Sequence, residues 1–197
     1  QLTVEYDRID VLANNAGALV VRPVTTADGF ELTMQTNHLA PFLLTSLLRD
    51  RVSRVVTTAS GAHRWGSLDA ANVGGALHRY RSMRAYGTSK QANILFTVEA
   101  ARRWPDVLSV AFHPGAVRTR FWGDNRVVAW GMRYSPGLRS PAKGAETLVW
   151  LASTPAERLT SGGYYLDCTL RRPLGKATDP VLAAGLWDAS AAAVGLG

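Results

Sequence analysis

The sequence predicts an α/β fold, a doubly wound and mainly parallel sheet with helices on both faces. Short apolar runs of strand character alternate along the chain with longer segments whose apolar residues recur at helical spacing. Parallel strands need such crossovers, so this alternation is typical of a sheet covered by helices on both faces. A chain of 197 residues without a linker-like break fits one domain over residues 1–197.

Four strands are expected, at residues 9–13, 54–59, 107–112 and 164–167. The first three each run into polar residues or glycine. These endings are Asn14-Asn15-Ala16-Gly17, Ser60-Gly61 and His113-Pro114-Gly115. Ligands bind beyond the carboxyl ends of the strands in open α/β sheets. The three endings therefore predict one shared crevice.

Four helices are expected, at residues 28–48, 83–104, 141–152 and 179–193. In the first, Asp28 is the expected N-cap and Pro41 should kink or interrupt the helix. Pro141 suits the first turn of the third helix. Residues 61–82 and 116–140 are predicted to be irregular, and the second of these stretches is rich in aromatic residues.

Composition excludes several classes of protein. The formal net charge is +7, but 19 of the 22 basic residues are arginines scattered without a long basic tract, so we expect no nucleic-acid partner. No run approaches the roughly 18–20 apolar residues of a membrane span. The single cysteine, Cys168, is compatible with a cytoplasmic protein. His38, His63 and His78 lack the spacing of metal ligands, so no metal is expected.

Tyr86 and Lys90 lie four residues apart at the start of the predicted helix 83–104. This spacing places them on one face of the helix. A lysine ammonium there would stabilise a phenolate and lower the pKa of the tyrosine from about 10. Tyr86 is thus a candidate general acid/base for an alcohol oxygen. Taken alone, such a pair is more often a core aromatic and a surface charge.

Five motifs in this order resemble the short-chain dehydrogenase/reductase family, and most closely its retinol dehydrogenase-like branch. They are Asn14-Asn15-Ala16-Gly17, Asn37 in TNHLAPFLLT, Ser60 in RVVTTASGAH, Tyr86-Gly87-Thr88-Ser89-Lys90, and His113-Pro114-Gly115-Ala116-Val117-Arg118-Thr119. The resemblance implies a Rossmann-like fold and an NAD(P)-dependent oxidoreductase that acts on an apolar small-molecule alcohol or carbonyl. It favours NADP slightly over NAD.

The resemblance also implies catalytic roles for four residues. Tyr86 would exchange the proton with the substrate oxygen, and Ser60 would hydrogen-bond that oxygen. Lys90 would lower the pKa of Tyr86 and bond the nicotinamide ribose. Asn37 would hold a water that links Lys90 to solvent. Two alternatives remain open: Ser60 could cap a strand end, and Asn37 could satisfy backbone groups freed by the kink.

Further residues would contact the cofactor, together with Tyr86 and Lys90. Asn14, Ala16 and Gly17 would pass beside its adenosine half. Pro114, Gly115, Val117 and Thr119 would contact its nicotinamide end, with Thr119 anchoring the carboxamide. Asn14 and Gly17 could instead be plain turn residues, and Pro114, Gly115 and Thr119 could belong to a plain turn after a strand.

The glycine-rich dinucleotide turn of the family is absent before residue 9. The chain therefore resembles strands 4–7 of the family fold without the first strand–helix units, roughly 90 residues. Strand 9–13 would then become an exposed edge. An alternative function follows, a catalytically silent module that assembles through this edge. Homo-oligomers through helices 28–48 and 83–104 are a further expectation from the resemblance.

Overall fold

The structure, a computed structural model, describes residues 5–75, 79–117 and 138–196. Within them, five strands form one sheet in the order β1-β2-β3-β4-β5. The strands are β1 (Leu12–Asn14), β2 (Arg54–Thr58), β3 (Leu108–His113), β4 (Tyr164–Leu166) and β5 (Thr169–Arg171). The first four run parallel, and β5 is antiparallel to β4. The predicted fold class, a partial Rossmann-like α/β fold, is confirmed.

The first strand differs from its predicted bounds. Its ladder with β2 begins only at Leu12, and Ile9 forms an isolated bridge with Val52 instead. Within the described residues β1 pairs only with β2, and Ala13 is exposed. β1 therefore forms one edge of the described sheet, as expected.

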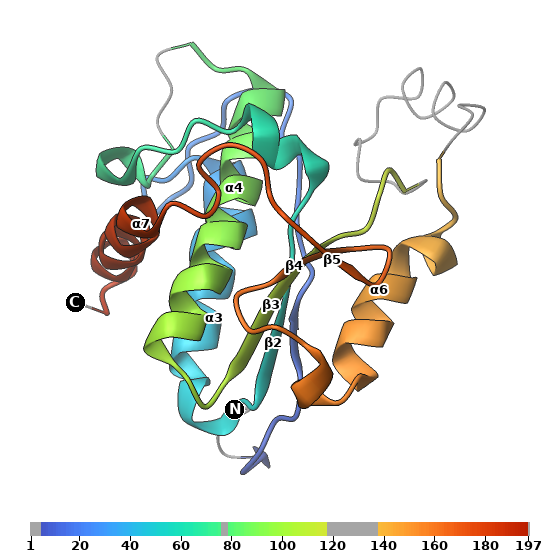
Figure 1. The fold of residues 1–197 in the computed structure, drawn as a ribbon. Coiled ribbons are helices and arrows are strands. Elements are labelled where there is room, and N and C mark those ends of the chain that lie inside the picture. The colour runs from blue at the N-terminus through green and yellow to red at the C-terminus, as the bar shows by residue number, and fades with distance from the viewer. Residues whose placement is uncertain (1–4, 76–78, 118–137, 197) are drawn as a thin grey trace.

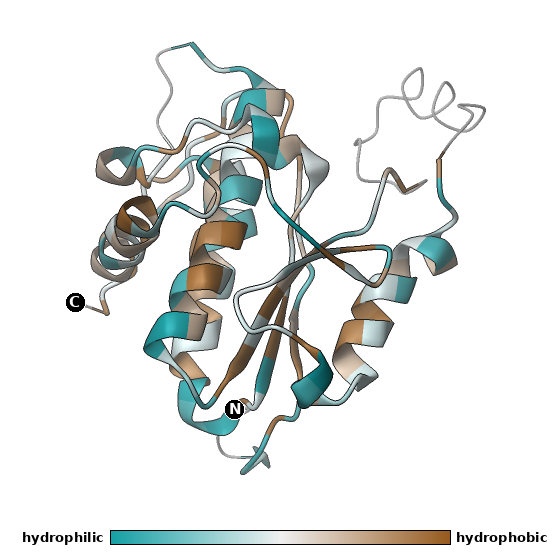
Figure 2. Cartoon of the chain, in the orientation of Figure 1, coloured by the Kyte–Doolittle hydropathy of each residue, from teal (hydrophilic) through white to brown (hydrophobic). Residues whose placement is uncertain are grey.

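The helices are α2 (Leu32–Met34), the π-helical turn η1 (Gln35–Leu39), α3 (Ala40–Leu47), α4 (Ser82–Arg103), α6 (Pro141–Ser153) and α7 (Pro180–Ala193). Figure 1 places α3, α4 and α7 on one side of the sheet and α6 on the other. Apolar residues concentrate on β2, β3 and the middle turns of α4 (Figure 2). Among the helices that the structure describes, none has the length and apolar character needed to cross a membrane.

The helix predicted at 28–48 begins later than expected. Glu31, not Asp28, is the N-cap, and its carboxylate accepts hydrogen bonds from the amides of Thr33 and Met34, both at 2.9 Å. The expected interruption near Pro41 is present as η1, where Ala40 N bonds Gln35 O. Proline has no amide hydrogen for the carbonyl four residues earlier, here that of Asn37.

The stretch predicted as irregular at residues 61–82 contains two 3₁₀ helices, η3 (Gly61–Trp65) and η4 (Ala70–Asn72). Each begins at a capping side chain, Ser60 for η3 and Asp69 for η4. Of the other irregular stretch, 116–140, residues 118–137 lie outside the described part of the chain.

α7 packs over α3 and α4 through aromatic rings. The ring of Trp187 lies 5.1 Å from Phe42, 5.8 Å from Phe96 and 4.8 Å from Trp104, measured between centroids. His38 Nε2 also lies 2.9 Å from Ser190 Oγ, so it has the structural role expected of it. These contacts cover apolar surface of both long helices with the chain's own C-terminal helix.

Candidate active site

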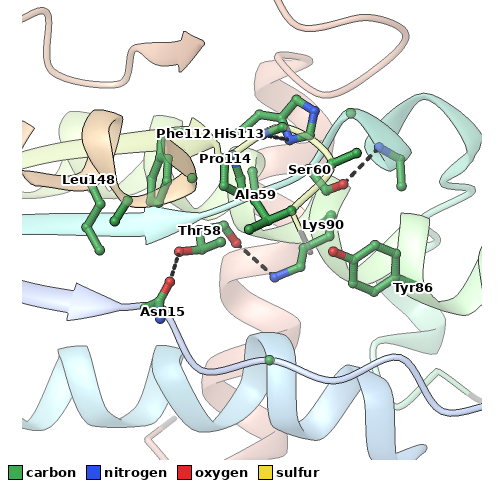
Figure 3. Close-up of a pocket in the computed structure, with 18 of the residues that line it drawn as sticks. Asn15, Thr58, Ala59, Ser60, Tyr86, Lys90, Phe112, His113, Pro114 and Leu148 are labelled. Carbon is green, nitrogen blue, oxygen red and sulfur yellow. Dashed lines mark hydrogen bonds between the residues drawn. The ribbon is translucent and has the colours of Figure 1, made fainter. Parts of the chain in front are cut away.

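A cavity of about 580 Å³ lies at the carboxyl ends of the central strands. It is lined by residues that follow β1, β2 and β3, together with residues of η3, α4 and α6 (Figure 3). The three predicted strand endings therefore do meet at one crevice. The volume is within the range of ligand pockets, roughly 300–1,000 Å³.

Ser60 and Tyr86 face each other in this cavity. Ser60 ends β2 with an extended backbone and caps η3, where its Oγ accepts a hydrogen bond from Ala62 N at 3.2 Å. Its side chain lies close enough to that of Tyr86 to lower the pKa of the phenol. Figure 3 shows both side chains beside Lys90. Ser60 is thus a helix cap as well as a neighbour of the tyrosine, so the two readings of this residue are compatible.

The side chain of Lys90 lies beside those of Ser60 and Tyr86 (Figure 3) and is 2% exposed. Its Nζ donates a hydrogen bond to Thr58 O at 2.9 Å and lies 5.6 Å from the centroid of the Tyr86 ring. Asn93 Nδ2 donates to the same carbonyl at 3.0 Å. Burial lowers the pKa of Lys90 to about 8. The lysine therefore sits at the site but is held by a main-chain oxygen.

The expected lowering of the Tyr86 pKa is wrong for this structure. Burial raises the pKa of Tyr86, and the hydrogen bond with Ser60 offsets only part of this rise. A buried phenolate loses its hydration, and the Lys90 ammonium is directed to Thr58 O. Tyr86 is therefore protonated at neutral pH.

Asn37 lies in η1 and is fully buried. Its Oδ1 accepts from Ala18 N at 2.7 Å, and its Nδ2 donates to Ala18 O and Ser89 Oγ, both at 2.9 Å. The structural alternative expected this side chain to satisfy backbone groups, and it does so. The backbone groups belong to Ala18 in the loop after β1, however, and not to the interrupted helix. Because Asn37 bonds both Ala18 and Ser89, it links the loop after β1 to α4.

Gly17 allows that loop to approach the lysine closely. A Cβ at this position would lie 3.2 Å from Asn37 Oδ1 and 3.3 Å from Lys90 Nζ. Asn14 and Ala16 are not among the described residues that line the cavity, because Asn14 Nδ2 bonds Thr45 Oγ1 at 2.8 Å and Ala16 faces solvent. The neighbouring Asn15 lines it instead, and its Oδ1 accepts from Thr58 Oγ1 at 2.9 Å.

Pro114, Gly115 and Val117 also line the cavity and form one of its walls. Gly115 has φ of 82°, and the side chain of Arg139 occupies the space that a Cβ there would need. Arg139 N bonds Ala116 O at 2.8 Å, and its guanidinium makes an ion pair with Asp167 in which Nη2 lies 2.9 Å from Oδ2. Thr119 lies outside the described residues.

His113 lines the cavity, as expected of a strand ending, although the sequence analysis assigns it no role. Its Nδ1 accepts a hydrogen bond from Gly115 N at 3.3 Å. Burial and the nearby Arg139 lower its pKa to about 4, so the ring is neutral. Its position at the end of a predicted strand is the sequence feature that marks it as a candidate site residue. Other lining residues were missed because nothing local marks them: Thr58, Trp65, Met83 and Leu148.

The charge of the cavity suits an anionic ligand. Among the described lining residues, Arg64 and Lys90 carry charge and none is a carboxylate. A dinucleotide is such an anion. In the described part of the chain no group of three or more His, Cys, Asp or Glu residues is placed to hold a metal ion.

Comparisons with known proteins agree with this architecture. A family model described as short chain dehydrogenase matches residues 1–127. The chain therefore belongs to the short-chain dehydrogenase family, in the branch of the retinol dehydrogenases, and its family is one of NAD(P)-dependent oxidoreductases. DnrU of Streptomyces sp. (strain C5), a proposed daunorubicin C-13 ketoreductase, is 55% identical over 197 residues, which cover 99% of this chain and 68% of DnrU.

Human retinol dehydrogenase 14 is 36% identical over 213 residues, covering all of this chain and 62% of that protein. A crystal structure of an uncharacterised protein from Mycobacterium paratuberculosis superposes with a TM-score of 0.75 at 32% identity, covering 98% of this chain and 70% of the other. The chain thus spans about two thirds of the length of these relatives.

Proposed function

We propose that the protein is an NAD(P)-dependent oxidoreductase that interconverts an alcohol and a carbonyl, with Tyr86 as the general acid/base. The observation that carries this proposal is that Tyr86, Ser60 and the buried Lys90 line one cavity at the strand ends, with their side chains together (Figure 3). The names of the relatives support the reaction type, since one is called a ketoreductase and the others retinol dehydrogenases.

In reduction, Ser60 would hold the carbonyl oxygen and Tyr86 would donate its proton to it. The raised pKa of Tyr86 keeps the proton available at neutral pH. The nicotinamide, when bound, supplies the hydride. Lys90 would bond the nicotinamide ribose and resupply the proton, and a water held at Asn37 would link Lys90 to solvent.

Gly17, Pro114, Gly115 and Val117 would contact the cofactor directly. We propose that Asn14 and Ala16 act on it only through the shape of their loop, and that Thr119 contacts the carboxamide. The preference for NADP over NAD rests on the branch that the motifs resemble. An apolar substrate is supported by the lining residues Ala62, Met83 and Leu148. A cytoplasmic location rests on the single cysteine alone.

The test is a titration of the complete gene product with NADPH and NADH, followed by turnover of simple ketones and alcohols. The proposal predicts saturable binding, stronger for NADPH, and ketone-dependent oxidation of the cofactor. Saturable binding without turnover of any alcohol or carbonyl would contradict it.

The alternative, a catalytically silent assembly module, is favoured by one observation. β1 forms an edge of the described sheet, and an edge strand can pair with another chain. Sedimentation velocity of this 197-residue chain over a hundredfold concentration range tests this alternative. A mass that rises with concentration supports it, and a constant monomer mass opposes it.

A further inference from the structure

Trp65 lies at the mouth of the cavity with much of its ring in solvent. It lines the cavity and is 52% exposed, whereas lining residues deeper in the sheet, such as Phe112, are buried. The guanidinium carbon of Arg64 lies 4.6 Å from the centroid of the indole. A large aromatic ring left half in water at the rim of an apolar pocket is a strong candidate for contact with a ligand.

The backbone around Trp65 is fixed relative to the reacting groups. η3 begins at the Ser60 cap and ends at Trp65, so one short helix carries both residues. His63 Nδ1 lies 2.6 Å from Ser60 O, and Gly66 N bonds His63 O at 3.0 Å. Five residues of 3₁₀ helix span about 10 Å. The main chain at Ser60 and at Trp65 is therefore separated by about this length, which leaves room between the two residues for a molecule larger than its carbonyl group.

The surroundings of Trp65 favour a flat and unsaturated molecule. Met83, from the first turn of α4, lines the same cavity and is 37% exposed. Thioethers and indoles both make favourable contacts with aromatic rings. The lining residues contribute no carboxylate among those the structure describes, and Arg64 adds a positive charge. Uncharged or anionic aromatic molecules therefore suit this rim, and cationic ones do not.

We propose that Trp65 is a specificity-determining residue that stacks on an aromatic ring system attached to the reacting carbonyl. The substrate class is thus an aryl ketone or aldehyde, extended enough to reach from Ser60 to the cavity mouth. This inference rests on the proposed function for the reaction, but the stacking contact can be measured without turnover.

The experiment compares two ketones that share a reacting group, 2-acetylnaphthalene and cyclohexyl methyl ketone. The complete gene product is tested as wild type, Trp65→Phe and Trp65→Ala. Val149→Ala is the control, because Val149 is exposed on α6 and is not among the described lining residues. Calorimetry gives Kd for both ketones without cofactor, and initial rates at saturating NADPH give kcat and KM.

We expect Trp65→Ala to raise Kd and KM for the naphthyl ketone by about 3–10-fold, the magnitude of an aromatic pair, with kcat within about twofold. The cyclohexyl ketone should change by less than about twofold, and Trp65→Phe should keep most of the naphthyl preference. Equal changes for both ketones, no change, or no binding of the naphthyl ketone to the wild type would overturn the inference. Naphthyl binding that depends on Trp65 without turnover would uphold it while contradicting the proposed function.

Discussion

Gly66 and Gly87 face each other across the contact between η3 and α4. A Cβ on Gly87 would lie 2.6 Å from Ala62 O and 3.1 Å from Gly66 N, and a Cβ on Gly66 would lie 2.8 Å from Gly87 O. The obstacles at Gly87 are all backbone atoms, which cannot rotate away as a side chain can, whereas the nearest obstacle at Gly66 is the side-chain Oε1 of Gln91, at 2.6 Å. The two glycines therefore let η3 lie directly on α4, and this contact brings Ser60 to the side chain of Tyr86.

Gly87→Ala should push η3 away from α4. We expect a loss of about 1–3 kcal/mol in the free energy of unfolding, the usual range for overpacking, and a fall in kcat of at least about tenfold because Ser60 and Tyr86 separate. Urea unfolding and initial rates measure the two effects. Gly185→Ala in α7 is the matched control. Its nearest described contact would be Ala70 Cβ at 3.4 Å, so it should be neutral or stabilising. Equal behaviour of the two variants would contradict this account.

Lys90 should make stability depend on pH. Burial lowers its pKa from 10.5 to about 8, so between these values the unfolded chain binds more protons than the folded one. The free energy of unfolding should therefore gain a contribution that rises with pH from about 8 to about 10, on the order of 2–3 kcal/mol in total. The comparison is urea unfolding of wild type and Lys90→Met at intervals from pH 7 to 10. An unchanged slope in the variant would show that another group titrates.

Arg139 should position the wall formed by Gly115 and Val117. Its pair with Asp167 is partly exposed, so Arg139→Gln should cost less than about 1 kcal/mol of stability. We expect KM for the cofactor to rise by about 3–10-fold with kcat within about twofold, because the wall loses its support. Arg8→Gln, which breaks the exposed pair with Asp10, is the control and should leave KM unchanged. A change in stability alone would assign Arg139 a purely structural role.

Trp187 should be the main anchor of α7. Its ring contacts Phe42, Phe96 and Trp104, so Trp187→Ala removes several aromatic contacts at once. We expect a loss of about 3 kcal/mol in the free energy of unfolding. Val181→Ala on the same helix should change it by less than about 0.5 kcal/mol, since Val181 is 81% exposed. Equal effects of the two substitutions would mean that α7 contributes little to the core.

The parts of the fold that sequence predicts well are those with strong apolar runs. The second and third strands lie between neighbouring strands and are buried except at terminal residues, and their bounds shift by a residue at most. β5 was not predicted, because all three of its residues are exposed and show no apolar alternation. It forms because Asp167 and Cys168 adopt φ of 52° and 56° and reverse the chain.

The sequence predicts which segments form the site, but not how each of their side chains is oriented. Motif order marks the strand ends that meet, but it does not fix the direction of each side chain. Successive strand residues point to opposite faces, and in a strand of three residues the pattern is too short to tell whether Asn14 or Asn15 enters the cavity. The pKa of Tyr86 depends on where Lys90 Nζ points, and that direction is set by Thr58 O, 32 residues away in sequence.

The central claim is that Tyr86 transfers the proton. The most direct measurement is turnover of a ketone by Tyr86→Phe in the complete gene product, with NADPH binding followed in parallel by tryptophan fluorescence. Removing one hydroxyl should leave the fold and the cofactor Kd within about twofold and lower kcat by at least about 10²-fold, the lower bound for general acid catalysis. Turnover within tenfold of wild type, with cofactor binding intact, would contradict the account.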